Sequence, residues 1–336
     1  MPNKLFPGII TKTNPTHQDV HVDVPLTNVS IAYLQSTDEY VADQVFPRVP
    51  VQKQSDQWYI YNKGDWFRPE ATVRPPSTES AGGGYRLSTD TYNCEVYAWH
   101  QDVDDRVMAN YDSPLEPRRD ATEWVMQTML ISRDVDFANA YFTTGVWGES
   151  GGDNDLTAGV EFVQWSEPVN SDPIGDISSY KRAVKLATGR KANGLLINGP
   201  VYDTLVQHPD IIERIKYTQS ALNIGPSLVA NALGVDRLIV AEGIQNTGAE
   251  GATVNMSGIF GNHALLFYAP PRPSLLTPSA GYTFAWTGYG GQNAYGVTMD
   301  AWYERKVKST RVEGEMAYDM KVVAGEMAYF FEDVIA

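Results

Sequence analysis

The clearest periodic pattern of apolar residues runs from residue 117 to about residue 142. Apolar and small side chains recur there every three or four residues, the spacing of one face of an α-helix: Ala121, Trp124, Val125, Thr128, Ile131, Val135, Ala138 and Phe142. Pro117 suits the first turn, and Asp120 lies near the positive end of the helix dipole. About 25 residues at 1.5 Å each predict a helix of roughly 38 Å.

Two further segments alternate between apolar and polar positions, as β-strands do. They span residues 57–61 and 91–99, and in the second the even-numbered positions from Tyr92 to Ala98 share one face. About 29 residues rich in proline, serine and glycine separate the two segments, which is longer than the usual irregular connection in a compact domain. The pattern therefore predicts a long two-stranded loop, residues 57–99, that projects from the body.

From residue 176 to residue 290, short helical patterns alternate with short apolar runs. Residues 176–188 predict an amphipathic helix that has Asp176 as its N-cap and ends before Gly189. The other elements expected are strands at 195–198, 237–241 and 264–268, and helices opening at Gly199 and spanning 208–215 and 227–233. This order predicts a mixed α/β domain.

The two ends of the chain have other patterns. Residues 1–28 are polar, contain four prolines and show no period, so we expect an extended arm that is ordered by an external surface. Residues 296–336 are β-rich and contain the sequence Gly-Glu-Met-Ala-Tyr twice, which is too little to indicate a solenoid. Together these patterns predict an α+β fold with about two domains.

The charge balance restricts the possible functions. The chain has 41 Asp and Glu against 26 Lys and Arg, a formal net charge of -15. Proteins that bind nucleic acid or anionic membranes over a broad surface carry the opposite sign. Cys94 is the only cysteine, which excludes an intrachain disulfide and suits a reducing compartment. With neither a membrane-spanning apolar run nor a signal-peptide pattern, the sequence predicts a soluble protein made in the cytoplasm.

Several short motifs are candidates for chemistry, but each has a simpler explanation. Residues 148–152 match G-x-S-x-G, the motif of a hydrolase nucleophile at Ser150, but the expected helix before them does not fit the strand–turn–helix context of that motif. Residues 102–105 include three aspartates, which suit either a divalent cation or an acidic helix start. His17 and His21 have no third metal ligand nearby. We therefore expect no catalytic residue, no cofactor and no metal.

The order of arm, projecting loop, long helix, mixed domain and returning β-segment resembles the major capsid protein of tailed bacteriophages, which has the Hong Kong 97-type fold. The resemblance spans nearly the whole chain. Its most telling part runs from Leu195 to Tyr217, where a strand, a helix and the pair His208-Pro209 follow one another as in the family's axial domain. Residues 25–33 and 41–50 resemble the arm that leads into its peripheral domain.

The resemblance implies a division of the chain into the parts of that fold. Residues 1–35 would be the N-terminal arm, 57–99 the extended loop and 176–290 the axial domain. The peripheral domain would combine residues 36–56, 100–175 and 291–336, with the spine helix at 117–142.

By the same resemblance, the chain self-assembles as hexamers and pentamers into the icosahedral shell around a double-stranded DNA genome. It would be a virion capsid protein assembled in the host bacterial cytoplasm, with a separate scaffolding protein, a portal protein and a decoration protein as partners. The DNA would be enclosed without specific binding. Two alternatives stay open: an encapsulin-type bacterial compartment shell, which shares the fold, and a hydrolase that uses Ser150.

One contact between subunits is expected at the projecting loop. A loop of about 29 residues cannot bury Trp66, Phe67 and Arg68 within itself. Aromatic and arginine side chains are the types that anchor interfaces. The alternative is that Trp66 folds back on its own hairpin.

A second contact is expected at the basic run 305–311. In a strand, Arg305 and Arg311 would point to one side, and Lys306 and Lys308 to the other. The run is then either solvated or in contact with an acidic surface of a neighbouring subunit.

Overall fold

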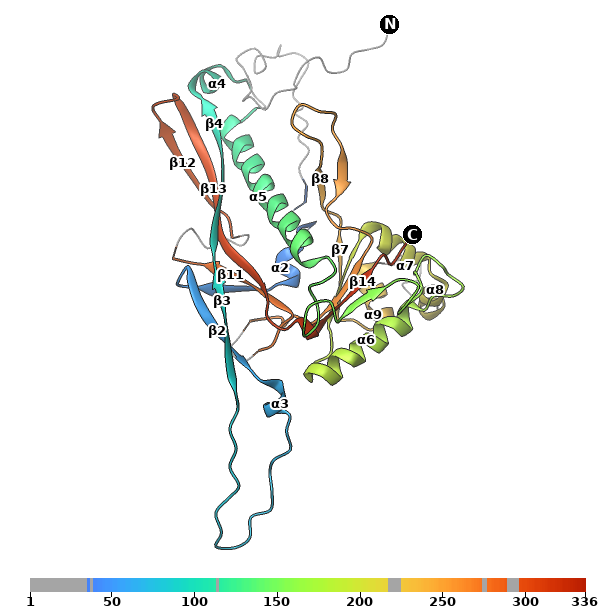
Figure 1. The fold of residues 1–336 in the computed structure, drawn as a ribbon. Helices are drawn as coiled ribbons and strands as arrows, with labels where there is room; N and C mark the ends of the chain where they lie inside the picture. Colours follow the sequence, from blue (N-terminus) through green and yellow to red (C-terminus); the bar gives the residue numbers. More distant parts are fainter. Residues whose placement is uncertain (1–34, 37–38, 113–114, 217–224, 274–276, 289–295) are drawn as a thin grey trace.

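Two five-stranded β-sheets form the framework of the molecule, and helices pack against both (Figure 1). The computed structural model describes residues 35–36, 39–112, 115–216, 225–273, 277–288 and 296–336. The predicted arm, residues 1–35, therefore lies almost wholly outside the described residues. Helices and sheets are both present, in agreement with the predicted α+β class.

The first sheet is organised around its longest strand, β13 (Ser309–Val322). The strands lie in the order β1–β11–β13–β12, and β4 pairs with the opposite edge of β13. The bounds of these partners are Arg48–Val51 for β1, Gly281–Trp286 for β11, Thr298–Glu304 for β12 and Glu95–Asp104 for β4.

Helix α5 (Pro117–Tyr141) lies along one face of this sheet. The even-numbered residues of β13 from Val312 to Met320 are buried toward it, while the odd-numbered residues between them stay partly exposed. Gly314 permits the close approach of the helix, because a Cβ there would lie only 2.9 Å from Val125 Cγ1. Strict alternation along one strand therefore builds the surface on which the long helix packs.

The predicted helix 117–142 matches α5 almost residue for residue, but part of the predicted buried stripe is wrong. Trp124 is 40% exposed, and Met129, Leu130 and Phe137 are buried although the stripe left them out. The helix is covered on two sides. The first sheet packs against one side, and Phe46 and Phe260, which lie outside that sheet, contact the helix at Phe137. Two covering surfaces bury a wider arc than one apolar stripe predicts.

A buried carboxylate on α5 holds the segment that precedes the first strand. Asp134 is fully buried and accepts hydrogen bonds from the backbone N–H groups of Val41 (2.9 Å) and Ala42 (3.2 Å). These residues begin the short helix α2 (Ala42–Val45), whose N-terminus the carboxylate caps. Burial raises the pKa of Asp134 to about 6.

The raised pKa predicts that Asp134 makes subunit stability depend on pH. The free carboxyl group titrates at 3.8 and the folded one at about 6, so the folded state loses about 3 kcal/mol of stability as the pH rises through this interval. The variant Asp134→Asn should lack this loss. Urea unfolding at about pH 4 and about pH 7 measures it. Glu123→Gln, on the same helix, is the control and should behave as wild type. The prediction would be contradicted if the free energy of unfolding of Asp134→Asn fell between the two pH values as much as that of wild type.

A two-stranded hairpin projects far from the body (Figure 1). Strand β2 (Ser55–Tyr61) pairs antiparallel with β3 (Leu87–Asn93), and the short helix α3 (Lys63–Trp66) follows β2. The predicted single strand 91–99 is wrong, because Cys94 interrupts it and separates β3 from β4. The Cys94 N–H donates a hydrogen bond to Gln54 O (2.8 Å). At this interruption the chain passes from the hairpin, where β3 pairs with β2, into the first sheet, where β4 pairs with β13.

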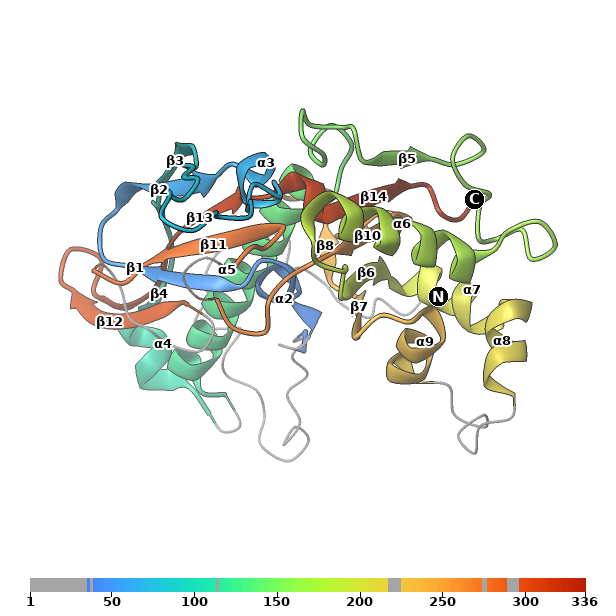
Figure 2. The same cartoon turned by 90° about the horizontal axis from the view of Figure 1, so that it is seen from below.

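The second sheet has the strand order β5–β14–β10–β6–β7, and most of the remaining helices lie around it (Figure 2). Its strands are β5 (Asp155–Thr157), β14 (Ala328–Glu332), β10 (Ala264–Phe267), β6 (Gly194–Asn198) and β7 (Arg237–Ala241). The helices are α6 (Pro173–Thr188), α7 (Gly199–Gln207), α8 (Pro209–Ile215) and α9 (Pro226–Leu233). Figure 2 shows the two sheets side by side, with α6–α9 gathered around the second.

Details of this part differ from the sequence prediction. The N-cap of α6 is Asp172 rather than Asp176, because Asp172 accepts from the Gly175 N–H at 2.8 Å and Pro173 opens the helix. Gly189 is the C-cap with φ of 77°, a conformation that favours glycine. The smaller elements are α4 (Asp105–Asn110), the 3-10 turn η2 (Gly325–Met327) and the hairpin of β8 (Ile244–Asn246) with β9 (Met256–Gly258).

The chain crosses between the two sheets more often than the predicted segments suggest. Strand β11 lies within the segment 176–290 but pairs with β1 and β13 in the first sheet. Strand β14 lies within 291–336 but pairs with β5 and β10 in the second sheet. Within the described residues, no helix is both long and apolar enough to cross a membrane.

Candidate intersubunit surfaces

The bend of the projecting hairpin exposes a small group of aromatic side chains. The Trp66 ring contacts Tyr61 edge to face, with centroids 5.5 Å apart, and Tyr85 at 5.9 Å. Trp66 is nevertheless 56% exposed. The structure thus shows both features that the sequence left open: the ring touches its own hairpin, and more than half of it is still available to a neighbour.

Phe67 and Arg68, the other predicted contact residues of the hairpin, adjoin Trp66. The Phe67 ring lies against the end of α6, because a Cβ on Gly189 would be 2.9 Å from Phe67 Cζ. The Arg68 side chain is 57% exposed and lies 3.3 Å from the Glu70 carboxylate. Asp65 accepts two hydrogen bonds from the Arg86 guanidinium, at 3.0 and 3.1 Å, which joins the two arms of the hairpin.

The root of the hairpin is fixed by a buried aromatic cluster. Phe284 on β11 stacks on Tyr92 (centroids 4.7 Å apart) and on Trp58 (5.1 Å). Cys94 is fully buried beside them, and burial raises the pKa of its thiol to about 11. A thiol of such high pKa stays protonated and weakly nucleophilic, so this cysteine has a packing role.

The predicted basic strand 305–311 is wrong in its first half. Residues 305–308 form the turn between β12 and β13, and residues 309–311 belong to β13, so Arg311 is the one cation of the run that lies within a strand. Arg311 forms a two-point ion pair with Asp102 on β4, at 2.7 and 2.9 Å. Arg305, Lys306 and Lys308 are exposed at the tip of the hairpin. The structure therefore separates a cation used within the subunit from three that face outward.

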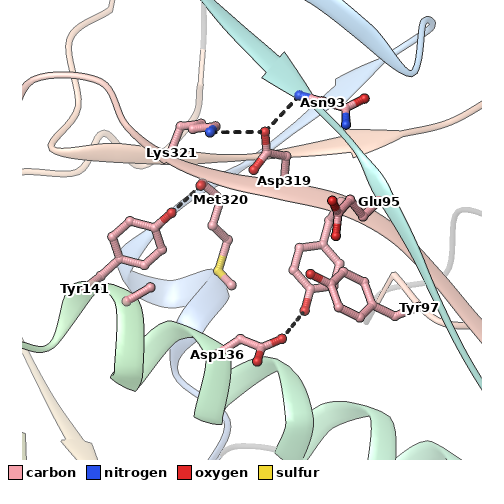
Figure 3. A pocket seen from close by; sticks show the side chains of 10 residues that line it. Asn93, Glu95, Tyr97, Asp136, Tyr141, Asp319, Met320 and Lys321 are labelled. Atoms are coloured by element: carbon pink, nitrogen blue, oxygen red, sulfur yellow. Dashed lines mark hydrogen bonds and ion pairs between the residues drawn. The ribbon is translucent and has the colours of Figure 1, made fainter.

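A pocket of roughly 380 Å³ lies between β13, α5 and the root of the hairpin (Figure 3). The Tyr318 hydroxyl donates to Asp136 at 3.3 Å, and the Tyr97 ring stacks on Tyr318 with centroids 4.8 Å apart. Burial raises the pKa of Asp136. Asp319, which also lines the pocket, accepts a hydrogen bond from the Asn93 N–H at 2.8 Å. These contacts all join elements of one subunit, so the residues of the pocket fix the root of the hairpin to the first sheet and to α5.

Comparison with known proteins gives the context for these surfaces. No protein-family model matches the chain. The chain is 25% identical over 321 residues to the major capsid protein of Pseudomonas phage JBD67, which covers 94% of this chain and 97% of the relative. It is also 25% identical over 272 residues to the major capsid protein of Burkholderia phage BcepMu, covering 78% of this chain and 82% of that relative.

Solved structures agree in fold. A phage-related protein from Bordetella bronchiseptica RB50 matches with a TM-score of 0.66 at 20% identity, covering 89% of this chain and 93% of that one. The capsid structure of Cyanophage P-SCSP1u matches with a TM-score of 0.54 at 14% identity, covering 98% of each chain. The chain therefore has the Hong Kong 97-type fold of phage capsids, and its sequence is similar to phage major capsid proteins over nearly its whole length.

The motifs that were candidates for chemistry have structural explanations. Ser150 lies in a series of turns that follows α5, without the strand–turn–helix of a hydrolase, and its N–H donates to Asp153 at 3.0 Å. Asp104 caps α4 and Asp102 is paired with Arg311. No group of three metal-ligating side chains occurs within the described residues, and His17 and His21 lie outside them.

Lys63 is the only lysine between residues 57 and 99, so it is the hairpin residue on which a covalent cross-link between subunits would depend. Its Nζ lies 2.5 Å from Glu326 and 3.4 Å from Glu149, both of the same subunit. An ammonium group held by two carboxylates is protonated and is a poor nucleophile. We therefore predict that boiled denaturing gels of particles show a single band near the subunit mass of 37.2 kDa. A ladder of multiples of that mass would contradict this.

The sequence patterns did not indicate an acidic surface that the structure shows on the first sheet. Asp300, Glu313 and Glu315 lie on the face of β12 and β13 that points away from α5. The available signal was the strict polar and apolar alternation from Arg311 to Lys321, which marks a half-buried strand. The position of Asp300 beside Glu313 depends on strand register, which the sequence alone does not show.

Proposed function

We propose that this chain is a major capsid protein that builds the icosahedral head shell of a tailed bacteriophage, and that the shell encloses the double-stranded DNA genome. The observation that carries the proposal is the similarity to phage major capsid proteins over 94% of the chain, on a fold shared with phage capsids. The role of the protein is then structural, and the surfaces that carry out this role are those that contact neighbouring copies.

Within this proposal, the first sheet with α5 forms the peripheral domain, and the second sheet with α6–α9 forms the axial domain of hexamers and pentamers. The hairpin of β2 and β3 is the extended loop, and residues 1–35 are the arm. Support comes from the sheet pairing and from the long projection of the hairpin (Figure 1). Burial of apolar surface, repeated around each symmetry axis, would drive assembly.

The proposal also includes partners. A scaffolding protein would guide closure in the host bacterial cytoplasm, a portal protein would occupy one vertex, and a decoration protein would bind outside. The net charge of -15 repels the phosphate backbone, which supports enclosure of DNA without specific binding.

Electron microscopy of the purified protein tests the proposal. Co-expressed with the head genes of its phage, the protein should form closed particles, and expressed alone it should form particles, rings or sheets. A monodisperse monomer in analytical ultracentrifugation at high concentration, with the scaffold present, would overturn the proposal.

An encapsulin-type compartment shell is the second candidate, because the SrpI encapsulin from Synechococcus elongatus PCC 7942 matches with a TM-score of 0.50 at 10% identity, covering 93% of this chain. That likeness concerns the fold alone, whereas the sequence relatives are phage proteins. Particles that take up a cargo enzyme and no DNA would favour this candidate.

A further inference from the structure

The outward face of the first sheet carries acidic residues directly opposite one another. Asp300 on β12 pairs in register with Glu313 on β13, and Glu313 pairs with His100 on β4. Residues opposite each other in an antiparallel pair share one face, with Cβ atoms about 5 Å apart. Glu315 lies two residues further along the same face.

This arrangement is unfavourable for an isolated subunit. Like charges directly opposite on neighbouring strands destabilise the pairing. Neither Asp300 nor Glu313 lies within ion-pair distance of a cation in the described part of the chain. Glu313 interacts electrostatically with Arg311 on the same face, but the Arg311 guanidinium is bound at two points by Asp102. Asp300 and His100 are exposed to solvent. The acidic face, defined here by Asp300 and Glu313, is therefore suited to a cationic partner.

A complementary surface lies at the tip of the same hairpin. The basic turn, residues 305–308, contains Arg305, Lys306 and Lys308, all exposed. None of the three forms an ion pair within the described residues. The turn is held in place, because the Asp105 N–H donates to Lys308 O at 3.1 Å. Figure 1 shows the hairpin of β12 and β13 ending beside α4, at the extremity of the molecule.

The basic turn cannot neutralise the acidic face of its own subunit. Glu313 is five residues from Lys308 along β13, which is roughly 17 Å of extended strand. This separation exceeds the length of a lysine side chain, and the hairpin is a paired ladder that does not fold back on itself. A second copy of the chain is the partner that presents the same cations from another direction.

We propose that the basic turn of one subunit docks on the acidic face of a neighbouring subunit. The contact rests on the proposed shell function and gives it a specific orientation. It is heterologous, since turn meets face, so that copies repeat around a closed ring. Charge complementarity at such a contact selects the register of neighbours that otherwise repel each other through a net charge of -15.

A second group of cations lies at the end of α6 but fits this role less well. Two of its members are used within the subunit, because Lys181 donates to Gly234 O and Lys185 donates to Gly189 O at 2.7 Å. Cations at a helix C-terminus also stabilise the helix dipole. Its outer members, Arg190 and Lys191, supply a control with the same change in charge.

Charge reversal with rescue tests the contact. The turn variant Lys306→Glu/Lys308→Glu and the face variant Asp300→Lys/Glu313→Lys should each lower the yield of particles about tenfold, because repeated ion pairs become repulsive. The variant with all four changes has the wild-type net charge and restores attraction, so it should return most of the yield. The control Arg190→Glu/Lys191→Glu should assemble as wild type. Circular dichroism of each subunit checks that the fold is kept.

The outcomes separate this contact from the shell function itself. If wild-type protein forms particles and the turn and face variants form them equally well, the contact is wrong and the shell function stands. If both variants fail and the fourfold variant fails too, although all remain folded, the two surfaces do not meet. If wild-type protein itself never assembles, the shell function fails first. Rescue specific to the fourfold variant would establish the contact.

Discussion

Phe137→Ala is expected to destabilise the subunit by about 4 kcal/mol, the largest effect of a single core substitution that we predict. Phe137 on α5 is fully buried and contacts Phe46 edge to face, with centroids 5.2 Å apart. It also contacts Phe260 at 6.3 Å and Tyr141 at 5.8 Å. The ring therefore joins the long helix to segments on both sides of it, and its loss leaves a cavity that three fixed rings cannot close.

Trp124→Ala on the same helix is the matched control. Trp124 is larger than Phe137 but 40% exposed, with Trp99 at 6.0 Å as its aromatic neighbour. Its removal should cost about 1 kcal/mol, because less of its surface is removed from water. Urea midpoints of the subunit compare the two variants. A larger loss for Trp124 than for Phe137 would show that the helix is packed in a different rotation.

Trp66→Ala should leave the subunit folded but reduce or abolish particles. The ring has 56% of its surface exposed at the bend of the hairpin, where Phe67 is also 67% exposed. Burial of one such aromatic against a neighbour contributes on the order of 2 kcal/mol, and each copy in a shell repeats it. Particle yield and the melting temperature of assembled particles measure the loss.

The aromatic contacts of Trp66 within its own hairpin call for a second variant. Trp66→Phe keeps a ring against Tyr61 and Tyr85 and an exposed apolar surface, so it should assemble nearly as wild type. If Trp66→Ala unfolds the subunit, the ring serves its own hairpin. If particles of Trp66→Ala keep the wild-type melting temperature, Trp66 does not stabilise a contact between the hairpin and a neighbouring subunit.

Local elements were predictable from the sequence where one local rule dominates. The long helix has a proline at its start and an apolar spacing that only a helix satisfies, so its bounds were right to one residue. Gly189 ends α6 as expected, because the left-handed conformation favours glycine. The start of α6 was wrong, since Asp172 and Asp176 are both suitable caps and Pro173 decides between them.

The candidate surfaces were less predictable. Residue type marked Trp66, Phe67 and Arg68, and the structure brings them together at one bend, but their contacts with Tyr85 and Gly189 join residues far apart in the chain. The basic run was assigned to a strand because alternation was assumed through it, whereas residues 305–308 reverse the chain between two strands. The residue types at 305–308 suit either a turn or a strand, and the backbone pairing of β12 with β13 makes this segment a turn.

The sequence by itself determined the elements, their order and the acidic character of this protein, because helix period, strand alternation and charge are local properties of the chain. The tertiary structure alone decided the strand registers, the rotation of α5 and the division of strands between the two sheets. Asp300 lies opposite Glu313, and Asp134 caps α2 across 92 residues of sequence, because of pairing and packing between distant segments. Such long-range contacts are set by the free energy of the whole fold, which no local pattern contains.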